Sequence, residues 1–179
     1  MEYIYVDNSN LFIEGRRVSA VSKGMARNIV EAMNHNILDH TYTIDFGKLH
    51  QFVAGADDAQ IARAALFGSR PPPNDSIWTF AKQAGFEVIL SDRNVKNKEK
   101  KVDTGITAAM VKDGYNQANA KNDVITLVAG DGDFVPAIEA LKAGGYTVEL
   151  VFWDHASAEL KKAASKFVSL NKHLDHLAL

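Results

Sequence analysis

The segment Val124–Pro136 constrains the fold of this chain more than any other. An apolar run over Val124–Ala129 breaks into a glycine-punctuated turn, and a helical pattern starts at Phe134. The turn carries two carboxylates, Asp131 and Asp133. Short continuous apolar runs are typical of buried parallel strands. A strand that leads through carboxylates into a helix places them at its carboxyl end, where open α/β sheets bind ligands.

Four other apolar runs have the length and composition of strands: Tyr3–Val6, Ile61–Phe67, Phe86–Leu90 and Tyr146–Trp153. Helical patterns separate them, over Asp45–Val53, Ser76–Ala84, Thr104–Asn116, Phe134–Ala143 and Ser157–Leu170, and a short helix is expected to begin at Leu11. Alternating strands and helices predict an α/β fold. We expect three α/β/α layers around a central, mostly parallel sheet of about five strands.

The length of 179 residues is that of one domain with a sizeable core. We therefore expect a single domain over residues 1–179. The pattern between Arg16 and Thr43 is weak, and we interpret residues 16–43 as a helical insertion. Within it, Met25–Leu38 has apolar residues near helical spacing, which predicts one amphipathic helix.

The composition limits the partners of the chain. No run approaches the roughly 18 apolar residues of a membrane span, so we expect no membrane partner. The absence of cysteine excludes disulfides and thiolate metal sites and fits a cytoplasmic location. The net charge of −2 gives no overall attraction for nucleic acid, so a polyanion has to meet a local basic patch. The sequence leaves open whether the chain forms a homo-oligomer.

Four carboxylates are expected to meet at one edge of this sheet. Asp7 follows the first strand, Asp131 and Asp133 follow the fourth, and Asp103 starts the helix between the third and fourth. If the strand order reverses beside the first strand, the first and fourth strands are neighbours and their carboxyl ends share a crevice. Oxygen-only ligands suit Mg²⁺ or Mn²⁺. Such ions stabilise the charge that develops in phosphoryl displacement.

Each of these carboxylates also has a purely structural interpretation. Asp103 and Asp133 can each cap the helix that follows, and Asp7 can make an Asx-turn. Taken singly, these interpretations are at least as good as a metal role. Helix capping gives no reason for acidic residues to gather at one edge of the sheet. The four carboxylates taken together therefore favour a shared acidic site.

A basic stretch leads directly into Asp103 and is expected to border the acidic crevice. Its cationic residues are Arg93, Lys96, Lys98, Lys100 and Lys101. Lysines there could hold a nucleic-acid backbone, but a solvated loop explains the charges equally well. Beyond the last strand, His155 is interpreted as an exposed turn histidine. The C-terminal His173 and His176 lie on an end that is expected to fray, which is a poor metal site.

Three blocks of the chain resemble the signature blocks of NYN domains, in the order of that family: Val6–Phe12, Lys100–Asp103 and Ala129–Pro136. The closing segments Ser157–Leu160 and Phe167–Leu170 resemble the last helix of the family. NYN domains belong to the PIN-like nuclease superfamily and include a bacterial LabA-like group. The resemblance implies a PIN-like, Rossmann-like fold, an acidic Mg²⁺ or Mn²⁺ site, and cleavage of RNA phosphodiester bonds.

The resemblance also implies roles for individual residues. The acidic positions of the family, which are catalytic and hold metal, match Asp7, Asp103, Asp131 and Asp133 of this chain. Among the residues expected to bind substrate, Asn10 and Ser157 match polar positions of the family, and Lys98, Lys100 and Lys101 belong to the basic stretch described above. The chain departs from the family pattern at Lys101, where glycine is common, and at Ser165, where an acidic residue is often found. Neither departure removes an acidic ligand.

The sequence therefore predicts a metal-dependent ribonuclease that hydrolyses single-stranded or flexible RNA. Two alternatives stay open. One is a catalytically silent RNA-binding or regulatory module that keeps the acidic pocket, and the other is a phosphoesterase acting on small molecules. The basic stretch favours a polymeric substrate over a small one. The turn at Gly130 does not complete the glycine pattern of dinucleotide-binding loops, which argues against that function.

Overall fold

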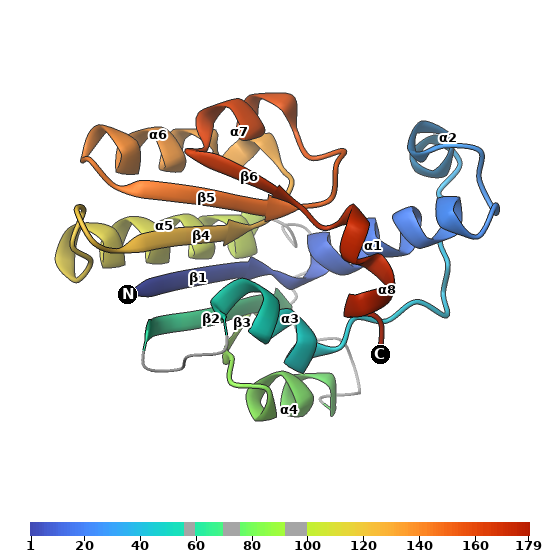
Figure 1. The fold of residues 1–179 in the computed structure, drawn as a ribbon, viewed down its shortest axis with the longest axis horizontal. Coiled ribbons are helices and arrows are strands. Elements are labelled where there is room, and N and C mark those ends of the chain that lie inside the picture. The colour runs from blue at the N-terminus through green and yellow to red at the C-terminus, as the bar shows by residue number, and fades with distance from the viewer. Residues whose placement is uncertain (56–59, 70–75, 92–99) are drawn as a thin grey trace.

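The structure is a computed structural model that describes residues 1–55, 60–69, 76–91 and 100–179. In these residues a six-stranded sheet has the order β3-β2-β1-β4-β5-β6, and every neighbouring pair is parallel (Figure 1). The strands are β1 (Glu2–Asp7), β2 (Ile61–Ser69), β3 (Glu87–Ser91), β4 (Val124–Val128), β5 (Thr147–Phe152) and β6 (Lys166–Ser169). The predicted reversal beside the first strand is confirmed, because β1 lies between β2 and β4.

Helices cover both faces of the sheet. One face carries α1 (Asn8–Ser22), α3 (Phe46–Ala54), α4 (Ser76–Gln83) and α8 (Leu174–Leu177), and the other carries α5 (Lys100–Asn116), α6 (Val135–Ala143) and α7 (Ala158–Ala163). The 3-10 turns η2 (Gly132–Phe134) and η3 (Asn171–His173) precede α6 and α8. The predicted three-layer α/β/α class is confirmed. No helix in the described ranges has the length and apolarity to cross a bilayer.

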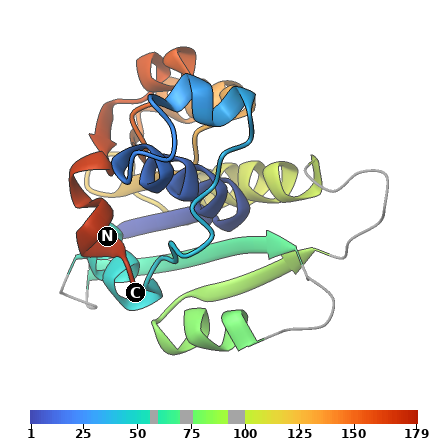
Figure 2. The same ribbon diagram turned by 90° about the vertical axis from the view of Figure 1, so that its right-hand side faces the viewer.

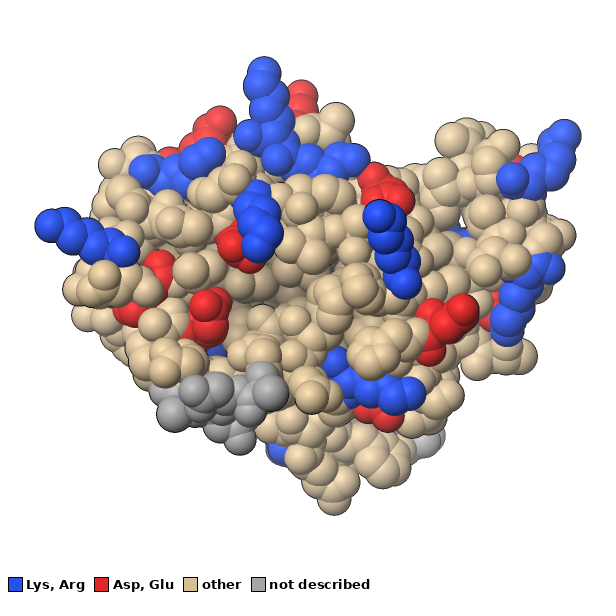
Figure 3. All heavy atoms as spheres, in the orientation of Figure 1, with Lys and Arg blue, Asp and Glu red and all other residues tan. Residues whose placement is uncertain are grey.

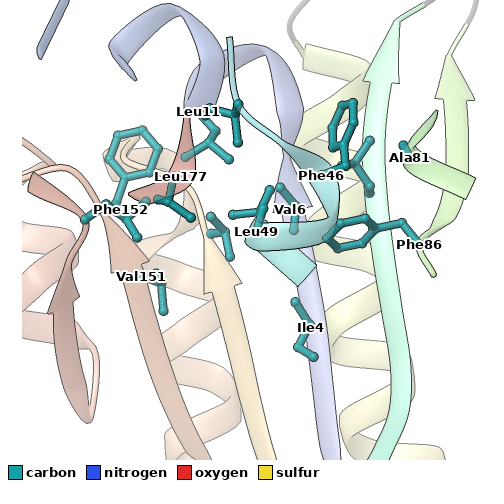
Figure 4. Packing of buried hydrophobic residues seen from close by; sticks show 14 of the residues in the cluster. Ile4, Val6, Leu11, Phe46, Leu49, Ala81, Phe86, Val151, Phe152 and Leu177 are labelled. Carbon is teal, nitrogen blue, oxygen red and sulfur yellow. The ribbon is translucent and has the colours of Figure 1, made fainter. Parts of the chain in front are cut away.

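The pleat of β1 divides the core into two clusters. Ile4 and Val6 point to the cluster under α1 and α3, which Figure 4 shows, whereas Tyr3 and Tyr5 point to the cluster under α5 and α6. Side chains of a strand alternate between its two faces. Asp7 therefore continues the row of Tyr3 and Tyr5, on the face of the sheet that α5 covers.

Local signals for several helix ends agree with the structure. Asp45 caps α3, because its Oδ1 accepts a 2.9 Å hydrogen bond from the backbone N–H of Lys48. Gly85 ends the turn after α4 with a φ of 104°, a conformation that costs glycine little and other residues much. Both features were expected from the sequence.

The sheet has six strands where about five were expected, and the prediction of one helix over Ser157–Leu170 is wrong. The helix α7 ends at Ala163, and the chain then turns extended at Ala164. Residues Lys166–Ser169 pair with β5 and form the sixth strand. The alanines and lysines of this segment favour helix locally. Pairing with the free edge of β5 overrides that preference, as tertiary contacts often do for short segments.

The single amphipathic helix over Met25–Leu38 is also wrong. The first helix, α1, starts directly after β1 and runs through Ser22, and α2 covers only Ile29–Asn34, beyond the end of α1 (Figure 1). Of the residues Ile29, Val30, Met33 and Ile37, whose spacing suggested a buried face, Val30 and Met33 are exposed, whereas Ile29 is partly buried against the core. Without a core to cover, the apolar spacing does not extend the helix.

A buried carboxylate holds the chain after α2 against α1. Asp39 accepts a 2.7 Å hydrogen bond from the hydroxyl of Ser19 and pairs with Lys23 at 2.7 Å. It also accepts hydrogen bonds from the backbone N–H and the hydroxyl of Thr41. These bonds hold the pKa of Asp39 well below its usual range, with that of Lys23 the largest cause and that of Ser19 next. Charge-assisted bonds of this kind fix the course of a segment that has little regular structure.

The C-terminal end is docked, so the expectation that it frays is wrong. Leu174 and Leu177 are buried in the cluster under α1 and α3. The backbone N–H of Asp45 donates to the Leu177 carbonyl at 2.9 Å, and the Lys48 ammonium donates to the Ala178 carbonyl at 2.6 Å. Leucines spaced for burial therefore anchor the tail.

Replacing Leu177 with alanine tests this docking. We expect Leu177→Ala to lower the free energy of unfolding by about 2–5 kcal/mol, because it leaves a cavity in a closed part of the core. Urea denaturation measures the loss. Leu179→Ala is the matched control, since Leu179 is 84% exposed, and its effect should stay within about 0.5 kcal/mol. Equal effects of the two variants would show that the tail is not part of the core.

Candidate metal centre

The first acidic residue of the predicted site, Asp7, ends β1 and caps α1. It is 6% exposed, and its Oδ1 accepts a 3.1 Å hydrogen bond from the backbone N–H of Asn10. The sequence predicted an Asx-turn for this residue, and the structure shows a helix N-cap in its place, which is also a local structural role. It does not compete with a role in the site, because the cap fixes the carboxylate at the carboxyl edge of the sheet.

Asn10 joins the loop after β1 to the loop after β4. Its side-chain Oδ1 accepts a 2.8 Å hydrogen bond from the backbone N–H of Gly130. On the other side, the backbone N–H of Ser157 donates to the Gly130 carbonyl at 2.9 Å. A Cβ at position 130 would overlap the ring of Phe152, so only glycine fits there. Asn10 and Ser157 therefore hold the acidic turn in place, and their contact with substrate stays a prediction.

The turn after β4 is shaped by Asp131. Its Oδ1 accepts a 3.1 Å hydrogen bond from the backbone N–H of Asp133 and caps the 3-10 turn η2. The interpretation of Asp133 as a helix cap is wrong, because α6 starts at Val135 and its N-cap, Phe134, has no side-chain capping bond. Both Asp131 and Asp133 are exposed.

Asp103 lies in the first turn of α5 rather than at its cap. The predicted start at Thr104 is wrong, because α5 already begins at Lys100. A carboxylate in the first turn is favoured by the partial positive charge of the unpaired N–H groups at a helix start. Like the other acidic residues, Asp103 thus has a local stabilising role at the place where it faces the site.

Three of the four predicted carboxylates line one cavity of about 450 Å³. They are Asp7, Asp103 and Asp131, whereas Asp133 is not among the lining residues. In Figure 1 the strands β1, β4 and β5 run toward the right-hand side, and Figure 2 turns that side toward the viewer, with α1 in dark blue and the start of α5 in yellow-green. The cavity therefore opens at the carboxyl edge of the sheet.

Electrostatics couple these three groups. The pKa of the Asp7 carboxyl is raised to about 6, chiefly by burial; the charges of Asp103 and Asp131 add to the rise, and the backbone N–H of Asn10 opposes it. Asp103 and Asp131 are thus each close enough to repel the charge of Asp7. A cation in the cavity would relieve that repulsion.

The donor chemistry fits Mg²⁺ or Mn²⁺. All three groups are carboxylates, the hard oxygen ligands that these ions prefer. In the described ranges no three His, Asp or Glu side chains are grouped tightly enough to hold an ion together. Mg²⁺ usually keeps several waters and takes only one or two carboxylates directly. Asp7, Asp103 and Asp131 would accordingly hold the ion partly through water.

The basic stretch that was expected to border the cavity lies only partly within the described residues. Arg93, Lys96 and Lys98 lie outside the described residues, and Lys100 and Lys101 are the first two residues of α5. On the face shown in Figure 3, basic and acidic side chains are interspersed. This face therefore carries no extended patch of a single charge sign.

Sequence reasoning missed two charged residues of this cavity, Glu14 and Arg17. They lie four and seven residues after Asn10, the spacing of one helix face, which is the signal that could have found them. Arg17 pairs with Glu14, and Glu14 also contacts the Nε2 of His155 at 2.6 Å. The interpretation of His155 as an exposed turn residue is wrong, because its side chain is largely buried against Glu14.

The fold and the acidic edge together define a nuclease-like α/β protein. The family model for the NYN domain matches residues 3–171. The chain belongs to the NYN domain family, which is part of the PIN-like nuclease superfamily.

Among solved structures, a protein of unknown function from Vibrio parahaemolyticus RIMD 2210633, VPA0982, is similar at a TM-score of 0.68 and 20% identity, over 99% of this chain and 95% of that one. At this identity the similarity concerns the fold. No curated protein matches the chain.

Because the pKa of Asp7 is raised in the folded protein, ionisation of its carboxyl lowers the free energy of unfolding as the pH rises. The stability that this carboxyl contributes is fully present below its ordinary pKa of 3.8 and is lost as the pH rises through about 6. We therefore expect Asp7→Asn, which keeps the capping oxygen, to raise the free energy of unfolding by up to about 3 kcal/mol near pH 8 and to give no gain near pH 4.

Urea denaturation of both proteins at the two pH values, without divalent metal, measures this difference. The control is Asp154→Asn, because Asp154 is exposed. A gain from Asp7→Asn that is the same at both pH values, or no gain at either, would contradict the buried, repelled state of Asp7.

Proposed function

We propose that this chain is a metal-dependent ribonuclease that hydrolyses the phosphodiester bonds of single-stranded or flexible RNA. One observation carries the proposal. In an NYN domain, Asp7, Asp103 and Asp131 come from three distant segments and line one cavity at the carboxyl edge of the sheet. Separate helix-capping roles give no reason for this convergence. A site for a divalent cation and a phosphate does.

A bound Mg²⁺ or Mn²⁺ would act as a Lewis acid toward the phosphoryl oxygens of the substrate. The three carboxylates would hold and orient it. Asp7 has to be ionised for this task, so its pKa of about 6 favours activity at neutral and higher pH. Asn10 and Ser157 fix Gly130, and with it the position of Asp131, through their bonds to the turn.

A second candidate function is a catalytically silent RNA-binding or regulatory module. It is favoured by the spacing of the acidic groups, since no three in the described ranges are grouped tightly enough to bind one ion directly, without bridging water. This candidate predicts RNA binding without turnover in any divalent metal. A phosphoesterase for small molecules predicts the opposite pattern, with turnover of nitrophenyl phosphate and indifference to RNA.

Cleavage of a labelled single-stranded RNA in the presence of Mn²⁺ tests the proposal. We expect the wild-type protein to cut it, a chelator to stop the reaction, and Asp131→Asn to lower the rate about a hundredfold or more, because it removes a charge that holds the ion. Asp154→Asn, an exposed change of the same kind beyond β5, should cut at the wild-type rate. Activity that survives both the chelator and Asp131→Asn would refute the proposal.

The role of Asp133 can be measured in the same assay. Because its side chain does not line the cavity, we expect Asp133→Asn to lose clearly less activity than Asp131→Asn. The two substitutions are matched in chemistry and lie two residues apart on one turn. If they are equally damaging, Asp133 joins the other carboxylates when substrate or metal binds.

A further inference from the structure

One face of α1 lines the cavity beyond the carboxylates. Asn10, Ile13, Glu14 and Arg17 all contribute to its wall, at the spacing of one helix face. The step of seven residues from Asn10 to Arg17 corresponds to about 10 Å along the helix axis. The cavity therefore has an acidic end, at the carboxyl edge of the sheet, and a second end at Arg17.

Arg17 has hydrogen-bonding capacity that the protein does not use. Its Nη1 pairs with Glu14, and its Nη2 donates to the side-chain oxygen of Asn36 at 3.3 Å. The Nε of Arg17 is buried and has no hydrogen-bond acceptor among the described residues. A guanidinium carries five N–H donors, and a buried donor without an acceptor is costly. The Arg17 side chain is 17% exposed, so a ligand with several acceptor oxygens would reach the terminal N–H groups of the guanidinium rather than its buried Nε.

Glu14 fixes the guanidinium in place. Its side chain is only 11% exposed and is held between Arg17 and the Nε2 of His155, which lies at 2.6 Å. His155 follows β5 and so joins α1 to the far side of the sheet edge. An arginine that is held in this way loses little side-chain entropy when it binds an anion.

The negative charge of the cavity requires a positively charged side chain if a phosphate chain is to bind there. A phosphate chain that enters this cavity meets four carboxylates, those of Asp7, Asp103, Asp131 and Glu14, and is repelled unless positive charge lies within reach. The proposed metal supplies positive charge at the acidic end of the cavity. Along the remainder of the wall, Arg17 is the basic side chain among the described lining residues. Arginine recognises phosphate through paired N–H donors.

We propose that Arg17 binds the phosphate next to the one that is cleaved, so that the substrate strand runs along α1 from the carboxylates to Arg17. This inference rests on the proposed function and sharpens its substrate class. The substrate is a polynucleotide with at least two phosphates in sequence. A small phosphoester leaves Arg17 without its ligand.

Binding of a fluorescent single-stranded oligoribonucleotide, measured by anisotropy with Ca²⁺ in place of Mn²⁺, tests this role. We expect Arg17→Gln to raise Kd about tenfold or more and to reduce the slope of log Kd against log salt by about one. Arg17→Lys keeps the charge but loses the paired donors, so its Kd should lie between those of Arg17→Gln and the wild type. Arg27→Ala is the matched control, because Arg27 is 85% exposed and pairs only locally, with Glu31.

A modified substrate makes the test specific for one phosphate. An oligonucleotide in which a neutral methylphosphonate replaces the linkage next to the cleaved bond should bind wild-type protein as weakly as Arg17→Gln binds normal RNA. Arg17→Gln should lose nothing further on this substrate, because the two changes remove the same contact. If Arg17→Gln does not fold, Arg17→Lys and the wild-type protein on the modified RNA still carry the test.

The outcomes separate this inference from the proposed function. If the wild type binds and cleaves RNA but the Arg17 variants match Arg27→Ala in Kd and salt slope, Arg17 is a structural ion pair and the inference is wrong. A lowered melting temperature with unchanged binding leads to the same conclusion. If the wild type neither binds nor cleaves RNA, the proposed function and the inference both fail.

Discussion

The hydrogen bond from the Gly130 backbone N–H to the Asn10 side chain, 2.8 Å long, holds the acidic edge of this protein together. It joins the loop that follows Asp7 to the loop that carries Asp131, across 120 residues of sequence. Parallel pairing of β1 with β4 brings the two loops side by side. The hydrogen bond then fixes their relative position, and the ring of Phe152 closes the space behind Gly130 to any larger residue. The position of Asp131 relative to Asp7 depends on this contact.

The acidic residues combine local structural roles with a shared electrostatic cost. Asp7 caps α1, Asp131 caps η2, and Asp103 lies in the favourable first turn of α5. Each of the three is therefore stabilised by its local contacts. Burial, together with the charges of Asp103 and Asp131, nevertheless raises the pKa of Asp7 to about 6. Proteins retain such conflicts mainly at functional sites, where a ligand resolves them. A similar conflict exists at Arg17, at the other end of the cavity, whose buried Nε finds no acceptor in the part of the chain that the structure describes.

The class of fold and the central pairing could be predicted from the sequence because buried parallel strands are short apolar runs and their carboxyl ends carry polar turns. The convergence of Asp7 and Asp131 follows from strand order alone. The sixth strand could not be predicted, since Lys166–Ser169 becomes a strand only by pairing with β5. Nor could the contact of His155 with Glu14, which are 141 residues apart. Short-range patterns identify elements, whereas partners across the fold are fixed only when those elements pack.

The central claim is that Asp7, Asp103 and Asp131 act together on one divalent cation. The most direct measurement is an anomalous difference map from crystals soaked with Mn²⁺, which locates the ion independently of any activity. The account predicts a peak in the cavity at the carboxyl edge of the sheet, within direct or water-mediated reach of the three carboxylates. The absence of a peak there at saturating Mn²⁺, or a peak confined to another part of the surface, would contradict it.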